Sequence, residues 1–191
     1  CVSPLIQQAP ATFHSMARIV MKFGGTSVAD LDRIRNVATR VKREVDAGNE
    51  VAVVVSAMSG TTNQLVDWTR GAAGPDLHGK DYYDEYDVIV ASGEQVTAGL
   101  LALALRRKGL KARSWLGWQL KLATDEAHGK ARITGCDNPD FIRSVDNGEI
   151  AVVAGFQGVD EHGRVSTLGR GGSDTSAVAV AAALKADLCD I

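Results

Sequence analysis

Two short apolar runs stand out in the first third of the chain. Ile19 to Phe23 leads into a pair of glycines, and Val51 to Val55 contains no polar residue. Unbroken apolar runs of this length predict strands that are buried on both faces, as in a parallel sheet. Between them apolar residues recur at helical spacing, and Ser27 and Gly48 are predicted to begin and end that helix. The pattern therefore predicts a βαβ unit.

The alternation continues along the rest of the chain. An apolar helical stretch at Ala98 to Leu105 follows Ser92-Gly93-Glu94 and precedes a predicted strand at Leu110 to Leu116. The later predicted elements are a short helix that opens at Asn138-Pro139, a buried strand at Ile150 to Ala154, a hairpin at Phe156 to Gly169, a helix at Ser173 to Leu184, and a last strand that begins at Leu188. The glycine-rich stretch from 71 to 80 is predicted to be a mobile loop.

Composition narrows the class of protein. The chain has 191 residues, a net charge of -2 and 45% hydrophobic residues, which describes a globular protein with enough material for one core. The balanced charges give no electrostatic footprint for nucleic acid or an anionic membrane, and the longest apolar stretch, around Leu100 to Leu105, is too short to span a bilayer. Cys1, Cys136 and Cys189 lie far apart, so a reducing cytoplasm fits better than a disulfide framework.

Residues 1–15 differ from the rest. They are low in charge, carry two prolines and run into Met16-Ala17-Arg18, which reads like a translation start. We expect them to be a leader, a remnant of cloning or an extension from a misplaced start codon. A targeting peptide remains an alternative.

The first segment that suggests chemistry is Lys22-Phe23-Gly24-Gly25-Thr26-Ser27. It lies where a strand is predicted to pass into a helix, so exposed backbone N–H groups would lie beside one lysine, an arrangement that suits a phosphate group. It matches neither the GxxxxGK[ST] loop nor the GxGxxG motif. A tight turn with a solvated lysine is an equal alternative for this segment alone.

Two further segments follow predicted strands or begin helices. Ser56 to Asn63, with the sequence SAMSGTTN, offers hydroxyl and N–H groups for a carboxylate, although a capped turn would use the same residue types. Glu94 stands at the start of a helix, where it could contact an ammonium group. By itself it is more simply explained as a surface acid that stabilises the helix dipole.

The most informative segment is Gly169-Arg170-Gly171-Gly172-Ser173-Asp174-Thr175-Ser176-Ala177. Three glycines around one arginine are costly in chain entropy unless the backbone must approach a ligand closely. Arg170 offers a planar fork for a carboxylate or phosphate, and Ser173 and Asp174 begin a helix whose amino end favours anions. The four histidines, by contrast, show no metal-ligand spacing and are expected in polar loops, while the three tryptophans are expected to be packing residues.

Taken together, KFGGTS at Lys22, SAMSGTTN at Ser56, SGE at Ser92 and GRGGSDTSA at Gly169 resemble the aspartokinase branch of the amino-acid kinase family. The resemblance extends from Arg18 to the end of the chain. It implies a three-layer αβα sandwich with a mostly parallel sheet, in which the amino-terminal half holds the amino acid and the carboxyl-terminal half holds ATP. Residues 16–191 would then be the amino-terminal, aspartate-binding part of the kinase domain, without the regulatory ACT domains.

The resemblance also implies a reaction. The γ-phosphoryl group of ATP, accompanied by Mg²⁺, would be transferred to the side-chain carboxylate of L-aspartate, the first step towards lysine, threonine and methionine. The parent enzyme would be a cytoplasmic homo-oligomer, and this chain alone would have little activity. Open alternatives are another amino-acid kinase, such as glutamate kinase, and a non-catalytic amino-acid-binding module.

By family analogy the site residues fall into three groups, and no metal ligand is expected. The catalytic residues would be Lys22 and Asp174. The substrate-binding residues would be Thr62, Glu94, Arg170 and Ser173. The phosphate-binding residues would be Lys22, Gly24, Gly25, Thr26, Ser27, Gly171 and Gly172.

Overall fold

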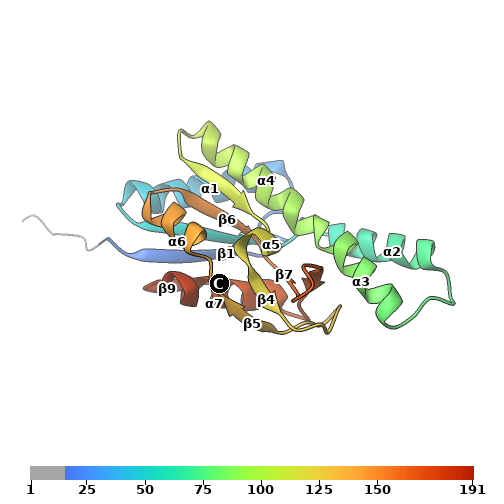
Figure 1. Ribbon diagram of the computed structural model, residues 1–191. Helices are drawn as coiled ribbons and strands as arrows, with labels where there is room; N and C mark the ends of the chain where they lie inside the picture. Colours follow the sequence, from blue (N-terminus) through green and yellow to red (C-terminus); the bar gives the residue numbers. More distant parts are fainter. Residues whose placement is uncertain (1–15) are drawn as a thin grey trace, which may run out of the picture.

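The structure, a computed structural model, describes residues 16–191, so the predicted leader at residues 1–15 lies outside the described residues (Figure 1). Its centre is a five-stranded sheet with the order β3-β6-β2-β1-β9, in which every neighbouring pair is parallel. The strands are β1 Arg18–Phe23, β2 Glu50–Val55, β3 Ala112–Trp115, β6 Ile150–Ala154 and β9 Leu188–Asp190. The sequence therefore predicted these strands correctly.

Helices cover both faces of this sheet, as Figure 1 shows. One face packs its side chains, such as Met21 and Val53, against α1 and α4, and the other packs Val20 and Val54 against α6 and α7. The helices are α1 Leu31–Asp46, α2 Thr61–Ala73, α3 Lys80–Val90, α4 Ser92–Arg107, α5 Gly117–Leu120, α6 Pro139–Asp146 and α7 Gly172–Leu184. The predicted three-layer αβα sandwich is confirmed, and its strands are apolar throughout because both faces are buried.

A smaller mixed sheet lies beside the central one, with the order β5-β4-β7-β8. Its strands are β4 Leu122–Thr124, β5 Ile133–Cys136, β7 Gln157–Val159 and β8 Val165–Thr167. The antiparallel pair β7–β8 confirms the predicted hairpin. The pair β4–β5 was not predicted, because its strands are three or four residues long and too short for a clear alternating pattern.

The start of α1 differs from the prediction. Asp30, rather than Ser27, caps the helix, and its carboxylate accepts the N–H of Arg33 at 2.8 Å. Ser27 is engaged in the preceding turn, where its N–H donates to the carbonyl of Gly24 at 2.9 Å. The predicted end at Gly48 is correct, since this residue has a φ of +91° just beyond the cap.

The sequence did not predict the helical hairpin α2–α3, which extends to one side of the sheet in Figure 1. Its connection spans only 74–79, so the predicted mobile loop at 71–80 overlaps the end of α2 and the start of α3. Only Leu65 and Thr69 of α2 are buried, which leaves too narrow an apolar stripe for a periodicity argument.

The helical stretch Asp81–Arg107, which runs through α3 and α4, is by length and composition apolar enough to cross a membrane. From the sequence, the apolar run at 100–105 was judged too short to span a bilayer, so this longer helical stretch was not predicted. Half of its apolar window is buried inside the protein, where α4 packs against α1, β3 and β6. Core helices of soluble proteins pass the same test, so this stretch is weak evidence for a membrane span.

Candidate active site

The predicted loops meet at the carboxyl ends of β1, β2 and β6, which are neighbours in the central sheet. A pocket of about 300 Å³ lies there, at the small end of the size range typical of ligand sites. It is lined by Gly25, Ser56, Ala57, Met58, Ser59, Gly60, Thr62, Glu94 and Phe156. Three segments of the sequence pattern, KFGGTS, SAMSGTTN and SGE, therefore contribute to one cavity.

Two glycines allow these segments to pack around Ala57. A Cβ atom at Gly25 would lie 2.9 Å from the carbonyl oxygen of Ala57, and a Cβ atom at Gly93 would lie 2.9 Å from the Ala57 methyl group. Both distances are shorter than real Cβ contacts, so any side chain at either position would push the loops apart. The close packing around Ala57 thus explains why glycine stands at these positions in two of the motifs.

Glu94 is the only ionisable residue among those that line the pocket, and it is 3% exposed. Its Oε1 accepts the N–H of Ala57 at 3.0 Å, whereas its Oε2 has no hydrogen-bond partner among the described residues. Burial raises the pKa of Glu94 to about 7, against the opposing effect of the backbone N–H groups of Ala57 and of Glu94 itself. The simpler prediction of a surface acid was therefore wrong. This carboxylate suits a cationic group in the pocket.

Lys22 and Asp174, from opposite ends of the chain, form an ion pair with Nζ and Oδ1 2.5 Å apart. Lys22 lies on β1 and its side chain is 15% exposed, while Asp174 lies in the first turn of α7 and is 49% exposed. Ser173, next to it, packs against the backbone of Gly155, where a Cβ atom would lie 3.0 Å from the serine side chain. The structure thus joins the GRGGSD segment to the ends of β1 and β6.

The backbone conformation and the close packing also explain two glycines of the GRGGSD segment. Gly171 caps α7 with a φ of +77°, a left-handed conformation that favours glycine. A Cβ atom at Gly172 would lie 2.7 Å from the ring of Phe156. Arg170 is exposed and does not line the pocket, and neither do Thr26 and Ser27, which are also exposed.

No sequence motif indicated Phe156, which lines the pocket with a φ of +66°. A bulky residue in this conformation is an outlier held by its surroundings. Its N–H donates to the hydroxyl of Ser176 at 3.0 Å, and its carbonyl accepts the N–H of Leu168 at 2.8 Å. In the sequence, Gly155 indicated a turn at this point, but the residue with the strained backbone is Phe156.

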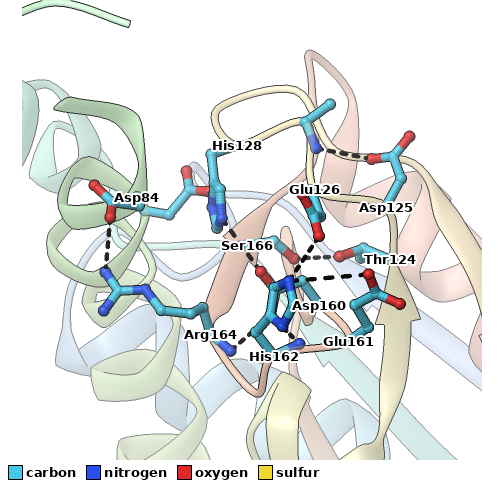
Figure 2. Close-up of polar contacts among 12 residues, drawn as sticks. Asp84, Thr124, Asp125, Glu126, His128, Asp160, Glu161, His162, Arg164 and Ser166 are labelled. Carbon is cyan, nitrogen blue, oxygen red and sulfur yellow. Dashed lines mark hydrogen bonds and ion pairs between the residues drawn. The ribbon is translucent and has the colours of Figure 1, made fainter. Parts of the chain in front are cut away.

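His128 lies in the turn between β4 and β5, as expected, but it is buried beside the carboxylates of Asp87 and Asp160. The exposed His162 places a ring nitrogen near carboxylate oxygens of Glu126 and Glu161, as Figure 2 shows, and the three ligand atoms lie within 4.8 Å of one another. The sequence predicted no metal ligand, and exposed groupings of this kind are common without an ion. Of the tryptophans, Trp115 is buried against Phe141, whereas the other two are largely exposed.

Comparison with known proteins places the chain in a family. Residues 17–191 match the amino acid kinase family. The chain is 53% identical to the aspartate kinase of Pseudomonas fluorescens (strain SBW25) and 52% identical to the aspartokinase of Geobacillus stearothermophilus, in each case over 92% of this chain and 42% of the relative. It therefore spans well under half the length of these relatives.

Solved structures agree with this placement. The aspartate kinase from Synechocystis matches with a TM-score of 0.74 and 46% identity, over 90% of this chain and 27% of that protein. E. coli aspartokinase III, solved in complex with aspartate and ADP, matches with a TM-score of 0.78 and 26% identity, over 91% of this chain and 48% of that protein. The matched residues, the sheet order and the pocket lead to one conclusion: the chain belongs to the amino acid kinase family.

Proposed function

We propose that the chain is the amino-acid-binding part of an aspartate kinase, which transfers the γ-phosphoryl group of ATP to the side-chain carboxylate of L-aspartate and forms 4-phospho-L-aspartate. The observation that carries this proposal is the buried Glu94 carboxylate, with one oxygen unpartnered among the described residues, in a pocket beside the KFGGTS turn. The names of the relatives point to the same reaction, and one structural neighbour was solved with aspartate and ADP.

In this proposal Glu94 accepts the α-ammonium group of aspartate. Thr62, which lines the same pocket, and Ser173, beside Gly155, donate hydroxyl hydrogen bonds to the carboxylates. Arg170 is exposed, so it would have to turn towards the pocket to bind a carboxylate as the family pattern implies. Its role therefore depends on a movement that the roles of Glu94 and Thr62 do not require.

The chemistry needs charge neutralisation more than a general base. The attacking carboxylate, with a reference pKa of about 3.9, is already ionised at neutral pH. Its approach to the phosphoryl group brings two anions together, so Lys22 and the N–H groups of the glycine turns would stabilise the charge of the transferring group. Asp174 holds the Lys22 ammonium in place. Mg²⁺ would enter with ATP, and we assign it no ligand in this chain.

The wider setting is part of the same proposal. The reaction would be the first step towards lysine, threonine and methionine, in a cytoplasmic and homo-oligomeric parent enzyme with neither nucleic acid nor membrane as a partner. The phosphate contacts of Gly24, Gly25, Thr26, Ser27, Gly171 and Gly172 would be completed by nucleotide contacts from outside this chain. We therefore expect little turnover from the chain alone.

The test is a hydroxamate assay for aspartyl phosphate with MgATP and aspartate. It compares this chain with a version extended by the carboxyl-terminal part of the Geobacillus stearothermophilus aspartokinase, a relative that this chain covers only in part. Activity only in the extended protein is the expected result. A folded extended protein that binds aspartate without phosphoryl transfer would support a binding module, and a preference for glutamate would support a glutamate kinase.

Calorimetry tests the role of Glu94 separately. Because the pKa of Glu94 is raised to about 7, the ionised form that attracts an ammonium group is lost as the pH falls through 7. We expect the affinity for aspartate to fall about tenfold per pH unit below that value, and to become independent of pH between 5 and 8 in Glu94→Gln. Equal pH dependence in the two proteins would remove Glu94 from the site.

A further inference from the structure

Helices α3 and α4 form a nearly continuous rod through Ala91, which has helical dihedral angles of φ −60° and ψ −21°. Asp87 on α3 precedes Glu94 on α4 by two helical turns, about 10 Å along the axis, and at this spacing both side chains lie on one face. Both are buried. A contact that fixes Asp87 therefore also fixes the backbone that carries Glu94.

Asp87 is fully buried and both of its carboxylate oxygens are occupied. Oδ2 lies 2.7 Å from Nδ1 of His128, and the N–H of Gly129 donates to Oδ1 at 3.0 Å and to Oδ2 at 3.1 Å. The hydroxyl of Thr167 donates to Oδ1. His128 and Gly129 belong to the turn between β4 and β5, and Thr167 lies on β8. The small sheet thus holds the rod from the side.

His128, the partner of Asp87, is itself held by a residue in a turn of the small sheet. The other ring nitrogen of His128, Nε2, lies 3.4 Å from Oδ2 of Asp160, in the turn between β7 and β8 (Figure 2). Oδ1 of Asp160 accepts the backbone N–H groups of His162 at 3.0 Å and Arg164 at 2.8 Å. His128 therefore lies between two buried carboxylates, each fixed to a different turn.

A second contact holds the junction itself. Gln157 on β7 is fully buried, and its Nε2 donates to the carbonyl of Ala91 at 2.8 Å. Its Oε1 accepts the side-chain amide of Gln95 at 3.3 Å and the N–H of Gly117 at 3.4 Å. Gly117 must lack a side chain here, because a Cβ atom would lie 2.6 Å from the carbonyl oxygen of Gln157. The junction is thus fixed one turn before Glu94.

We propose that Asp87 is a positioning residue: its contacts with the small sheet, together with the contact of Gln157 with Ala91, hold the α3–α4 rod so that Glu94 stays buried in the pocket. A buried group of paired polar side chains that served stability alone could often be replaced as a whole by apolar residues without loss of stability. Here the charged contact lies on the one rod that carries the pocket carboxylate. The inference rests on the proposed function only in that Glu94 then meets an amino-acid ligand.

The test observes Glu94 directly in the 191-residue chain. Carbon-13 labelling of the glutamate carboxyl groups gives NMR signals that titrate individually, and the Glu94 signal is identified by its loss in Glu94→Gln. The wild-type midpoint is expected near 7, because burial raises the pKa to about that value. In Asp87→Asn the midpoint is expected to fall by about 1 unit or more, since a loosened rod lets water reach the carboxylate.

The matched control is Asp81→Asn, on the same helix, where the residue is exposed and lies outside the Asp87 contacts. Its Glu94 midpoint should equal that of the wild type. Thr167→Val removes one donor to Asp87 and should shift the midpoint in the same direction by less, which keeps the test decisive if Asp87→Asn does not fold.

Lowered stability in these variants with an unchanged Glu94 midpoint would overturn the inference, as would a wild-type midpoint near the ordinary value of a glutamate. Calorimetry with aspartate on the same samples separates this inference from the proposed function. A shifted midpoint in a chain that binds no aspartate would support the positioning role and would count against the kinase.

Discussion

Ionised Glu94 is expected to destabilise the ligand-free protein. Burial raises its pKa from 4.5 to about 7, with the N–H groups of Ala57 and of Glu94 itself opposing the shift. Between these values the folded state keeps a proton that the unfolded state has released, so the free energy of unfolding falls as the pH rises. The shift of about 2.5 units, at about 1.4 kcal/mol per unit, corresponds to about 3 kcal/mol. This cost is absent below pH 4.5 and complete above pH 7.

The assay is urea unfolding of the wild type and of Glu94→Gln at a series of pH values from 4.5 to 8. Glutamine cannot ionise, so the difference in unfolding free energy between the two proteins should change by about 3 kcal/mol across this range, in favour of the variant at high pH. Taking the difference removes the effects of all other titrating groups. Glu161→Gln, at an exposed position, should follow the wild type throughout.

Parallel stability curves for the wild type and Glu94→Gln would refute this reasoning, because they would show that Glu94 titrates alike in the folded and unfolded states. The expected result would show instead that the pocket stores an unfavourable charge. An ammonium ligand would relieve that cost on binding, so the protein would give up stability at the position where the proposed ligand binds.

Two further predictions concern β1 and the turn that follows it. Lys22→Ala should abolish aspartyl phosphate formation in an extended, active protein while leaving the circular dichroism spectrum unchanged. The control Lys42→Ala, on the exposed side of α1, should change neither activity nor spectrum. Near-normal turnover in Lys22→Ala would refute the role of Lys22. Gly25→Ala should lower the free energy of unfolding by about 1–3 kcal/mol, because its Cβ would lie 2.9 Å from the Ala57 carbonyl oxygen. The control Gly135→Ala places its Cβ in open space and should change this free energy little. Equal urea midpoints for the two variants would contradict the steric argument.

Much of the candidate site could be predicted from the sequence. Local order along the chain was sufficient to indicate that Gly25, Thr62 and Glu94 follow strands or begin helices, and parallel strands bring such positions to one edge of the sheet. The resemblance of the motifs supplied the residue roles, which remain proposals. The sequence did not show that Arg170 would lie outside the pocket, because the direction of an exposed side chain depends on the packing around it.

The periodicity of the chain determined the central architecture. Runs such as Val51 to Val55 carry no polar residue, so they form strands only where both faces are covered, and this requirement by itself predicts helices on both sides of a parallel sheet. The same reasoning failed for the α2–α3 hairpin, because its helices bury few side chains and rely on contacts with each other and with β8.

Tertiary structure alone decided the electrostatics. The same pattern that places Glu94 at the start of a helix is consistent with a surface acid, and only the approach of Ala57 and the neighbouring loops removes its carboxylate from water. His128 likewise becomes a buried partner of Asp87 through a contact between segments far apart in the chain. Local sequence specifies which backbone conformation a segment prefers, but the burial of a charge depends on which distant segments surround it, and that is settled only when the fold is complete.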